Sequence, residues 1–345
     1  MNIKICKPTA VDLFCGCGGL TEGLKQAGFN VVGAVECNIV FVRTYKLNHK
    51  KVRVWVDDIK KLDPKKIRQK LQFKKGDLDL MAGCPPCQGF STVGTKNVND
   101  KRNDLVFEWL RFVKEFEPKT VMMENVKGLY EDKRITIIVE ELNKIGYKTG
   151  ETPKVLNVAD YGVPQRRKRM ILLAGKEKFI ELAKRKSKTK TVRQAIGNLP
   201  LPGNSDDKIH DYPEKRSAKV MRWIEKIPKN GGSYRNLKYA RQLPCHKRLG
   251  GGFKDIYGRM KWDDISPTIT GGCTNPSKGR FLHPEQNRAI TMREAALIQA
   301  FPASYKFSLI GGKGVISSMI GNALPPLFIK KHANKIIKHL KENHV

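Results

Sequence analysis

A cysteine in a proline-rich loop is the side chain best suited to covalent chemistry in this chain. Cys87 lies in the run GCPPCQGFS at residues 83–91, directly after the apolar segment 78–82. The apolar segment is typical of a short buried strand, and the glycine and prolines that follow it force a loop. A thiol displayed on such a loop, rather than packed in the core, can act as a nucleophile.

Charged side chains follow other apolar segments. Glu124 ends the segment 120–124, and the basic run QRRKR at residues 165–169 leads into the segment 169–174. Functional residues of α/β proteins gather outside the carboxyl ends of the strands, so we expect Cys87 and Glu124 at one sheet edge with guanidinium groups nearby. The ordinary alternatives are a helix-capping or exposed position for Glu124 and a solvated face for the basic run.

A glycine-rich turn near the N-terminus indicates a ligand pocket. The run DLFCGCGGL at residues 12–20 has the pattern of a strand that ends in a turn and opens a helix, which lets the backbone approach a ligand closely. Glu36 ends the next apolar segment, where an acidic side chain conventionally accepts hydrogen bonds from ribose hydroxyls. Asp58 follows the third segment, and no phosphate-binding lysine accompanies these groups. The pattern favours a nucleoside with an uncharged tail over ATP, with a turn that binds nothing as the alternative.

The apolar segments alternate with helical periods, which predicts an α/β fold with a mostly parallel, doubly wound sheet. We expect strands at 11–14, 31–35, 52–56, 78–82, 120–124 and 169–174, the sheet being parallel to that point, and helices at 20–27, 39–48, 104–116, 134–145, 291–300 and 327–340. From about residue 179 to 274 the sequence is rich in lysine, proline and glycine, which predicts a smaller loop-rich domain. The expected division is 1–185, 186–304, and 305–345 returning to the first domain.

The charge of the chain favours a polyanionic partner. The 345 residues include 66 Lys and Arg against 33 Asp and Glu, a formal charge of +33, and the basic residues recur along the whole sequence. Surface lysine that merely aids solubility is the plain alternative. No apolar stretch approaches the roughly 18 residues that span a bilayer, and the N-terminus has no signal-peptide pattern. The eight cysteines lack paired zinc-binding spacings, so we expect reduced thiols and no metal.

Six motifs, in order over nearly the whole chain, resemble those of the DNA cytosine 5-methyltransferase family. They are the glycine turn at 12–20, GCPPCQGFS at 83–91, ENV at 124–126, QRRKR at 165–169, REAALIQAFP at 293–302 and GNALPP at 321–326. The resemblance implies a Rossmann-like methyltransferase domain, a target-recognition domain within about residues 186–280, and S-adenosyl-L-methionine as the cofactor.

The resemblance also implies which residues bind this cofactor. Phe14 would stack on the adenine, Glu36 would hold the ribose, and Asp58 and Ile59 would contact the base. The remaining residues expected in the pocket are Gly16, Gly18, Pro86, Leu105 and Asn322.

By the same resemblance Cys87 attacks carbon 6 of a cytosine extruded from the duplex, and Glu124 holds or protonates ring nitrogen 3. Carbon 5 then takes the methyl group, and loss of its proton eliminates the cysteine. Arg167 would steady the ring and the adduct. The residues expected to contact DNA are Gln88, Ser91, Arg102 and Arg169.

The expected partners are double-stranded DNA and a restriction endonuclease acting on the same site. We expect a monomer without a membrane association, located in the cytoplasm with the nucleoid. Three alternatives remain open at this point: a tRNA methyltransferase of the same fold, a catalytically silent DNA-binding protein, and a thioredoxin-like reading of Cys84-Pro85-Pro86-Cys87.

Overall fold

The computed structural model describes residues 7–86, 100–185, 188–238 and 255–342, except for the side chains of residues 101 and 102. The chain forms two compact units. The first unit comprises residues 1–161, 168–186 and 324–345, and the second comprises residues 162–167 and 187–323. The second unit thus extends to Ala323, whereas the sequence analysis drew its boundary at residue 304.

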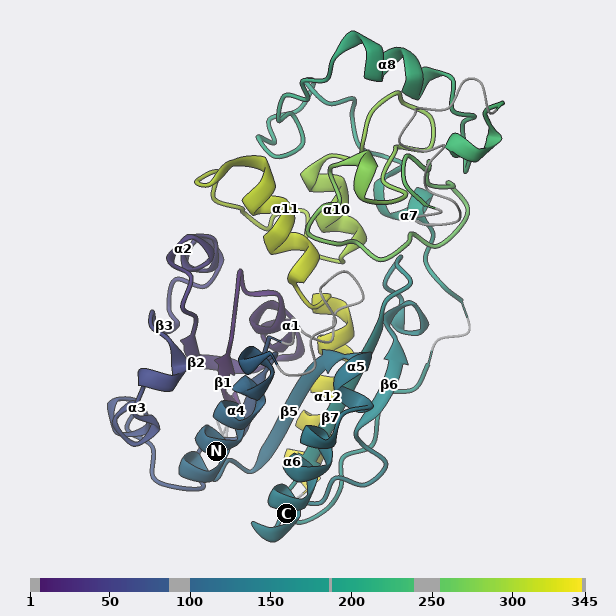
Figure 1. Cartoon of the computed structure of the whole chain (residues 1–345). Helices are drawn as coiled ribbons and strands as arrows, with labels where there is room; N and C mark the ends of the chain where they lie inside the picture. Colours follow the sequence, from purple (N-terminus) through teal and green to yellow (C-terminus); the bar gives the residue numbers. More distant parts are fainter. Residues whose placement is uncertain (1–6, 87–99, 186–187, 239–254, 343–345) are drawn as a thin grey trace, which may run out of the picture. The chain divides into compact units, whose positions relative to one another are not determined.

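A seven-stranded sheet forms the centre of the first unit, with the strand order β3-β2-β1-β4-β5-β7-β6 (Figure 1). The strands are β1 (Thr9–Leu13), β2 (Asn30–Val35), β3 (Arg53–Trp55), β4 (Leu80–Gly83), β5 (Thr120–Val126), β6 (Lys154–Asn157) and β7 (Lys168–Gly175). The pairings from β3 through to β5 are parallel. The predicted α/β class with a mostly parallel sheet is therefore confirmed.

The expectation that the sheet stays parallel as far as residue 174 is wrong for its last strand. β7 lies between β5 and β6 and runs antiparallel to both. Parallel neighbours need a crossover of a dozen or more residues, usually through a helix, and only residues 158–167 separate β6 from β7. This short connection turns the chain back, so β7 begins at the edge where β5 ends.

Helices cover both faces of the sheet. Because side chains alternate along a strand, Val11 and Leu13 face the apolar cluster formed with α4 and α6, whereas Asp12 faces α1. α1 packs against α12, and Figure 1 shows α4 and α6 in front of the sheet and α12 behind it. The helices of this unit are α1 (Gly19–Ala27), α2 (Ile39–Asn48), α3 (Pro64–Lys70), α4 (Leu105–Phe116), α5 (Lys127–Tyr130), α6 (Lys133–Lys144) and α12 (Pro326–Glu342), with short 3-10 helices η1 (Ile59–Lys61), η3 (Lys101–Asp104) and η4 (Val158–Tyr161).

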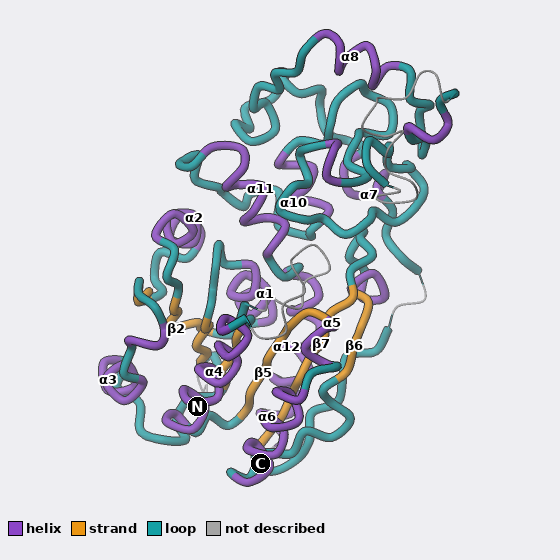
Figure 2. The backbone as a smooth tube through the Cα atoms, viewed as in Figure 1, coloured by secondary structure: helices purple, strands orange, loops and turns teal. Residues whose placement is uncertain are grey.

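The second unit is built mainly from loops and short helices (Figure 2). Its described helices are α7 (Val192–Ile196), α8 (Ala218–Glu225), α10 (Met292–Ile298) and α11 (Gly312–Asn322), with the 3-10 helices η5 (Tyr234–Asn236) and η7 (Pro276–Lys278). The fully buried Arg259 ties these loops together, because its guanidinium donates to the carbonyl oxygens of Ile224, Ile227, His283 and Gln286. The guanidinium of Arg259 thereby satisfies backbone carbonyl oxygens that would be paired with backbone amides in a sheet.

Among the described residues, no helix combines the length and the apolar character that a membrane span requires.

The packing of α1 on α12 leads to a stability prediction. A Cβ atom at Gly23 would lie 2.5 Å from Ile329 Cβ and 2.6 Å from the Pro326 carbonyl oxygen, whereas a Cβ at Gly314 of α11 would meet no described atom within 4 Å. Gly23→Ala should lower the free energy of unfolding by about 1–3 kcal/mol, because backbone must move. Gly314→Ala should leave it unchanged or raise it by up to about 1 kcal/mol.

Denaturant titration of both variants against the wild type measures the two effects. An unchanged unfolding midpoint in Gly23→Ala would contradict the close approach of α1 and α12.

Candidate functional site

The carboxyl ends of β1, β2, β4 and β5 meet at one edge of the sheet, because these strands run parallel. β7 begins at the same edge, since Arg169 pairs with Val126 at the end of β5. Most side chains singled out from the sequence follow these strand ends.

The turn after β1 has the backbone conformation that its glycines permit. Gly16 and Gly18 have φ angles of 54° and 98°, and Phe14 also has a positive φ of 62°. A Cβ at Gly16 would meet no atom of the described residues within 4 Å, so this part of the turn leaves open space beside it in the part of the chain that the structure describes. Gly18 is the N-cap residue of α1. The turn therefore exposes backbone at the start of a helix, which suits close contact with a ligand.

Glu36 at the end of β2 fixes this turn. Its Oε2 accepts a hydrogen bond of 2.9 Å from the Gly16 amide, and its Oε1 accepts one of 2.8 Å from the Asn38 amide. At the end of β3, Asp58 caps η1 by accepting from the Lys60 amide, and Ile59 is buried in the main core. Two acidic groups thus stand at adjoining strand ends.

A buried polar chain lies behind the turn. Asp12 of β1 is fully buried, and its Oδ2 accepts a hydrogen bond of 2.6 Å from Thr21 Oγ1, which is also 2.9 Å from the Tyr45 hydroxyl. Burial raises the pKa of Asp12 to about 7, with a smaller contribution from the charge of Glu36. Asp12 is a site residue that the sequence pattern does not single out, although its position two residues before Phe14 is a signal for it.

The loop after β4 is held from two sides. The Cys84 amide donates to the Leu13 carbonyl oxygen over 3.3 Å, and Asn125 Nδ2 donates to the Pro85 carbonyl oxygen over 3.0 Å. Pro86 follows, half-buried. Burial and the nearby Glu124 raise the pKa of the Cys84 thiol well above its ordinary value, so this thiol stays protonated at neutral pH. Asn125 is a supporting residue that the sequence analysis quoted without assigning it a role.

Three residues expected in this loop fall outside the described residues: Cys87, Gln88 and Ser91. Arg102 lies in η3, and its side chain is outside the described part. Leu105 opens α4 and packs partly buried against the main core.

Glu124 and Arg169 form a buried ion pair across β5 and β7. Arg169 Nε lies 2.9 Å from Glu124 Oε1, with the two side chains 16% and 8% exposed. Because Glu124 is buried and Arg169 is half-buried, this ion pair is weakly screened by solvent, and the charge of Arg169 acts strongly on the Glu124 carboxylate. The contact requires the antiparallel direction of β7: at the start of a parallel strand, Arg169 would lie at the opposite edge of the sheet.

Arg167 has a different setting. It belongs to the second unit, is 4% exposed, and donates to the carbonyl oxygens of Ile269 over 2.8 Å and Gly321 over 2.9 Å. Gln165 acts similarly, accepting from the Ile269 amide over 2.9 Å. The basic run therefore holds the second unit together through residues 165 and 167, whereas Arg169 contacts Glu124. Asn322, at the end of α11, also belongs to the second unit, where it donates to Ser318 Oγ over 3.2 Å.

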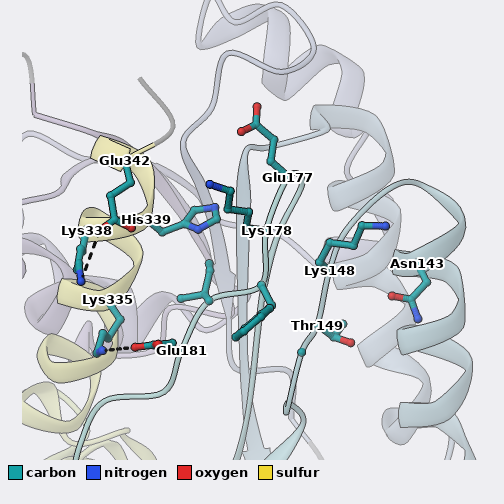
Figure 3. A pocket seen from close by; sticks show the side chains of 13 residues that line it. Asn143, Lys148, Thr149, Glu177, Lys178, Glu181, Lys335, Lys338, His339 and Glu342 are labelled. Atoms are coloured by element: carbon teal, nitrogen blue, oxygen red, sulfur yellow. Dashed lines mark hydrogen bonds and ion pairs between the residues drawn. The ribbon is translucent and has the colours of Figure 1, made fainter. Parts of the chain in front are cut away.

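A cavity of about 690 Å³ opens elsewhere in the first unit (Figure 3). Its lining includes Lys148 and Phe179, and Phe179 follows soon after the end of β7 in the sequence. The last residue of β7, Gly175, pairs with Thr120 at the start of β5. The cavity therefore lies at the edge of the sheet opposite Glu124, and it contains none of the residues singled out from the sequence. The described residues also contain no cluster of three or more His, Cys, Asp or Glu side chains arranged to hold a metal ion.

Comparisons with known proteins agree on one family. The family model for C-5 cytosine-specific DNA methylases matches residues 9–338. The type II methylase M.HgiDII of Herpetosiphon aurantiacus is 33% identical over 97% of this chain and 96% of its own length. The type II methyltransferase M.PspPI of a Psychrobacter species is 36% identical over 91% of this chain and 75% of its own length.

Solved structures share the fold. An E. coli prophage-encoded protein described as a DNA modification methyltransferase superposes with a TM-score of 0.74 at 22% identity, covering 97% of this chain and 99% of its own. A Spodoptera frugiperda DNMT2 variant superposes with a TM-score of 0.63 at 19% identity, covering 96% and 99%. With the glycine turn, the loop after β4 and the Glu124–Arg169 pair at one sheet edge, this chain belongs to the family of C-5 cytosine-specific DNA methylases.

Proposed function

We propose that this protein transfers a methyl group from S-adenosylmethionine to carbon 5 of a cytosine in double-stranded DNA, as a modification enzyme of the type II restriction–modification kind. The family match along the chain and the type II methylases among its relatives support the reaction class. The observation that carries the proposal is the buried ion pair between Glu124 and Arg169 beside the loop that leads to Cys87.

The residues of the first unit suit S-adenosylmethionine, which supplies an electrophilic methyl group on a sulfonium. The open space at Gly16 leaves room for a ligand against the turn. Glu36 would hold the ribose, Phe14 would stack on the adenine, and Asp58 and Ile59 would contact the base. Gly18, Pro86 and Leu105 complete this set, and we keep Asn322 as a member on the motif alone.

Cys87 would act as the nucleophile. Cytosine resists methylation at carbon 5 because that carbon is not itself nucleophilic. Addition of the thiolate to carbon 6 breaks the ring's conjugation and pushes electron density onto carbon 5, which then accepts the methyl group. Loss of the carbon 5 proton to a base returns the electron pair and expels the thiolate, so that the enzyme is regenerated.

Glu124 would stabilise the charge that develops during the attack. Addition at carbon 6 places negative charge on the ring, and a carboxyl group at nitrogen 3 offsets it by holding or supplying a proton. Arg169 contacts this carboxylate directly. We therefore assign to Arg169 the steadying role that the sequence analysis gave to Arg167, and we assign to Arg167 the integrity of the second unit.

DNA is the substrate that the remaining features favour. The formal charge of +33 suits a phosphate backbone, and attack on carbon 6 requires a cytosine extruded from the stack, at a cost of a few kcal/mol. We place sequence recognition in the second unit, with Gln88, Ser91 and Arg102 contacting DNA from the loop after Cys87. A monomeric enzyme in the cytoplasm, paired with an endonuclease of the same specificity, completes the proposal.

The first test is methylation itself. Purified protein is incubated with S-adenosylmethionine and plasmid DNA or total tRNA, and 5-methylcytosine is mapped by bisulfite sequencing. We expect modification of DNA at one recurring sequence, and its loss in Cys87→Ser, because a hydroxyl is a far weaker nucleophile than a thiolate near neutral pH. Cys273→Ser, which alters a buried thiol of the second unit, is the matched control and should stay active.

Modification of tRNA but not DNA would show that the protein is a tRNA methyltransferase of the same fold. Full activity of Cys87→Ser would remove the nucleophile from the proposal, and binding of DNA without methylation would favour a silent binding protein.

The second test separates the two arginines. Arg169→Lys keeps the charge but loses the planar group that meets Glu124, so we expect the single-turnover rate to fall by about 10²-fold with little change in the melting temperature. Arg167→Lys leaves the carbonyl oxygens of Ile269 and Gly321 short of donors, so we expect a loss of about 1–3 kcal/mol of stability. The folded fraction of Arg167→Lys should retain its rate.

Rapid-quench kinetics and thermal unfolding of both variants provide these quantities. The reverse pattern, a slow but stable Arg167→Lys beside a fully active Arg169→Lys, would return the steadying role to Arg167.

A further inference from the structure

We propose that the buried carboxylate of Asp12 is the counter-charge by which the cofactor pocket favours the cationic methyl donor over the neutral product of the transfer. This inference rests on the proposed use of S-adenosylmethionine. The donor carries a positive sulfonium, and after the methyl group leaves, the sulfur is an uncharged thioether in S-adenosylhomocysteine. A fixed negative charge near the turn therefore attracts the donor and releases the product.

The position of Asp12 supports this role. Asp12 lies in β1, two residues before Phe14, and its side chain is fully buried. One carboxylate oxygen is held by Thr21, and the other, Oδ1, is buried without a hydrogen-bond partner among the described residues. A buried carboxylate oxygen without a donor costs free energy that packing alone does not recover. A neighbouring cation offsets this cost.

The sulfonium is a group that only charge can recognise. It has no N–H or O–H and donates no conventional hydrogen bond, so acceptors that simply line a pocket do not distinguish it from a thioether. A carboxylate in a poorly solvated setting does distinguish them, because its field is weakly screened. Asp12 and Glu36 both act on the glycine turn electrostatically: burial raises the pKa of the Cys15 thiol most, and the charges of Asp12 and Glu36 raise it further.

The charge of Asp12 depends on pH in a useful range. Burial raises its pKa to about 7, Glu36 adds to the rise, and the hydrogen bond from Thr21 opposes it. Below this pKa the carboxyl group is neutral and has no preference for a cation. Above it the carboxylate is charged, so preference for the donor should increase with pH, and binding of the cation should release a proton from Asp12.

The thiols, the phenol and the imidazole that surround Asp12 change charge outside this range. Burial raises the pKa values of the Cys15 and Cys84 thiols and of the Tyr45 hydroxyl well above their ordinary values. Burial also raises the pKa of the Cys17 thiol to about 12. Burial lowers the pKa of His49 to about 3. Of the charged groups near Asp12, Glu36 acts on it directly, and Lys25 contacts His49, the residue that follows α2.

Calorimetric binding of the two ligands to the unmodified chain tests the proposal. The dissociation constants of S-adenosylmethionine and S-adenosylhomocysteine are measured at pH 6, 7 and 8. Both ligands carry the same amino and carboxyl groups, so the effect of their titration on binding cancels in the ratio of the two constants. We expect the preference for the donor to rise about tenfold from pH 6 to pH 8. At pH 7, titrations in buffers of different ionisation enthalpy should show proton release with the donor and less with the product.

Two variants identify the group responsible. Asp12→Asn keeps the size of the side chain and should give a preference that does not change with pH. Thr21→Val keeps the carboxylate and the backbone amide of residue 21 but removes the hydroxyl that donates to Asp12, so the pKa of Asp12 should rise and the pH dependence should move to higher pH. Thr21→Val thus provides a test even where Asp12→Asn does not fold.

A ratio independent of pH in the unmodified protein, or a pH dependence that persists in Asp12→Asn, would overturn the proposal while leaving the proposed function intact. Binding of neither ligand at any pH would overturn the proposed function, and this inference with it.

Discussion

The contact between Glu124 and Arg169 depends on two neighbouring strands that run in opposite directions. β5 delivers Glu124 to the carboxyl edge of the sheet, and β7, inserted antiparallel beside it, starts at that edge with Arg169. In a sheet that remained parallel, the arginine would lie at the far end of the strand. The reversal therefore places a cation beside the proposed acid of the reaction, and the same edge carries the loop that leads to Cys87 and the glycine turn proposed to hold the cofactor.

The same edge concentrates negative charge in a protein that is strongly positive overall. Asp12, Glu36 and Asp58 follow or belong to three adjoining strands, although the chain carries a net charge of +33. In the proposed reaction the basic residues would attract the DNA polyanion, and the acidic groups at the strand ends would favour the cationic methyl donor, so opposite charges in one molecule would select the two substrates. This separation explains why composition alone indicates a nucleic acid, whereas the strand ends indicate a nucleoside.

Much of the fold could be predicted from the sequence, because the central strands are apolar on both faces. β1, β2, β4 and β5 lie within a few residues of their expected positions, and so do α1, α2, α4 and α12. The helix α3 was missed because it is short and rich in lysine, with only Pro64 and Ile67 buried. The helix α11 was missed because its glycines and serines resemble a loop. β6 was missed because its four residues form a sheet edge that pairs with β7 alone.

The site was harder to predict than the fold, for a physical reason. The types and spacing of the residues pointed to Glu124 and to the basic run at residues 165–169. Within that run, however, neighbouring arginines enter two different environments that the sequence does not distinguish. Arg167 meets backbone carbonyls, and Arg169 meets a carboxylate, although the same residue type stands at both. Likewise, the support that Asn125 gives to Pro85 joins two segments that no local pattern relates.

The central claim is that Cys87 forms a covalent bond to cytosine during methyl transfer, and trapping that bond tests it most directly. The protein is incubated with S-adenosylmethionine and a duplex library in which one strand carries 5-fluorocytosine in place of cytosine. Because fluorine at carbon 5 cannot leave as a proton does, the adduct should persist after methylation. We predict a protein–DNA complex that survives denaturation, depends on the cofactor, and maps to Cys87 by mass spectrometry. The absence of any such complex on DNA that the enzyme methylates when unsubstituted, or a bond at Cys84 instead, would contradict this account.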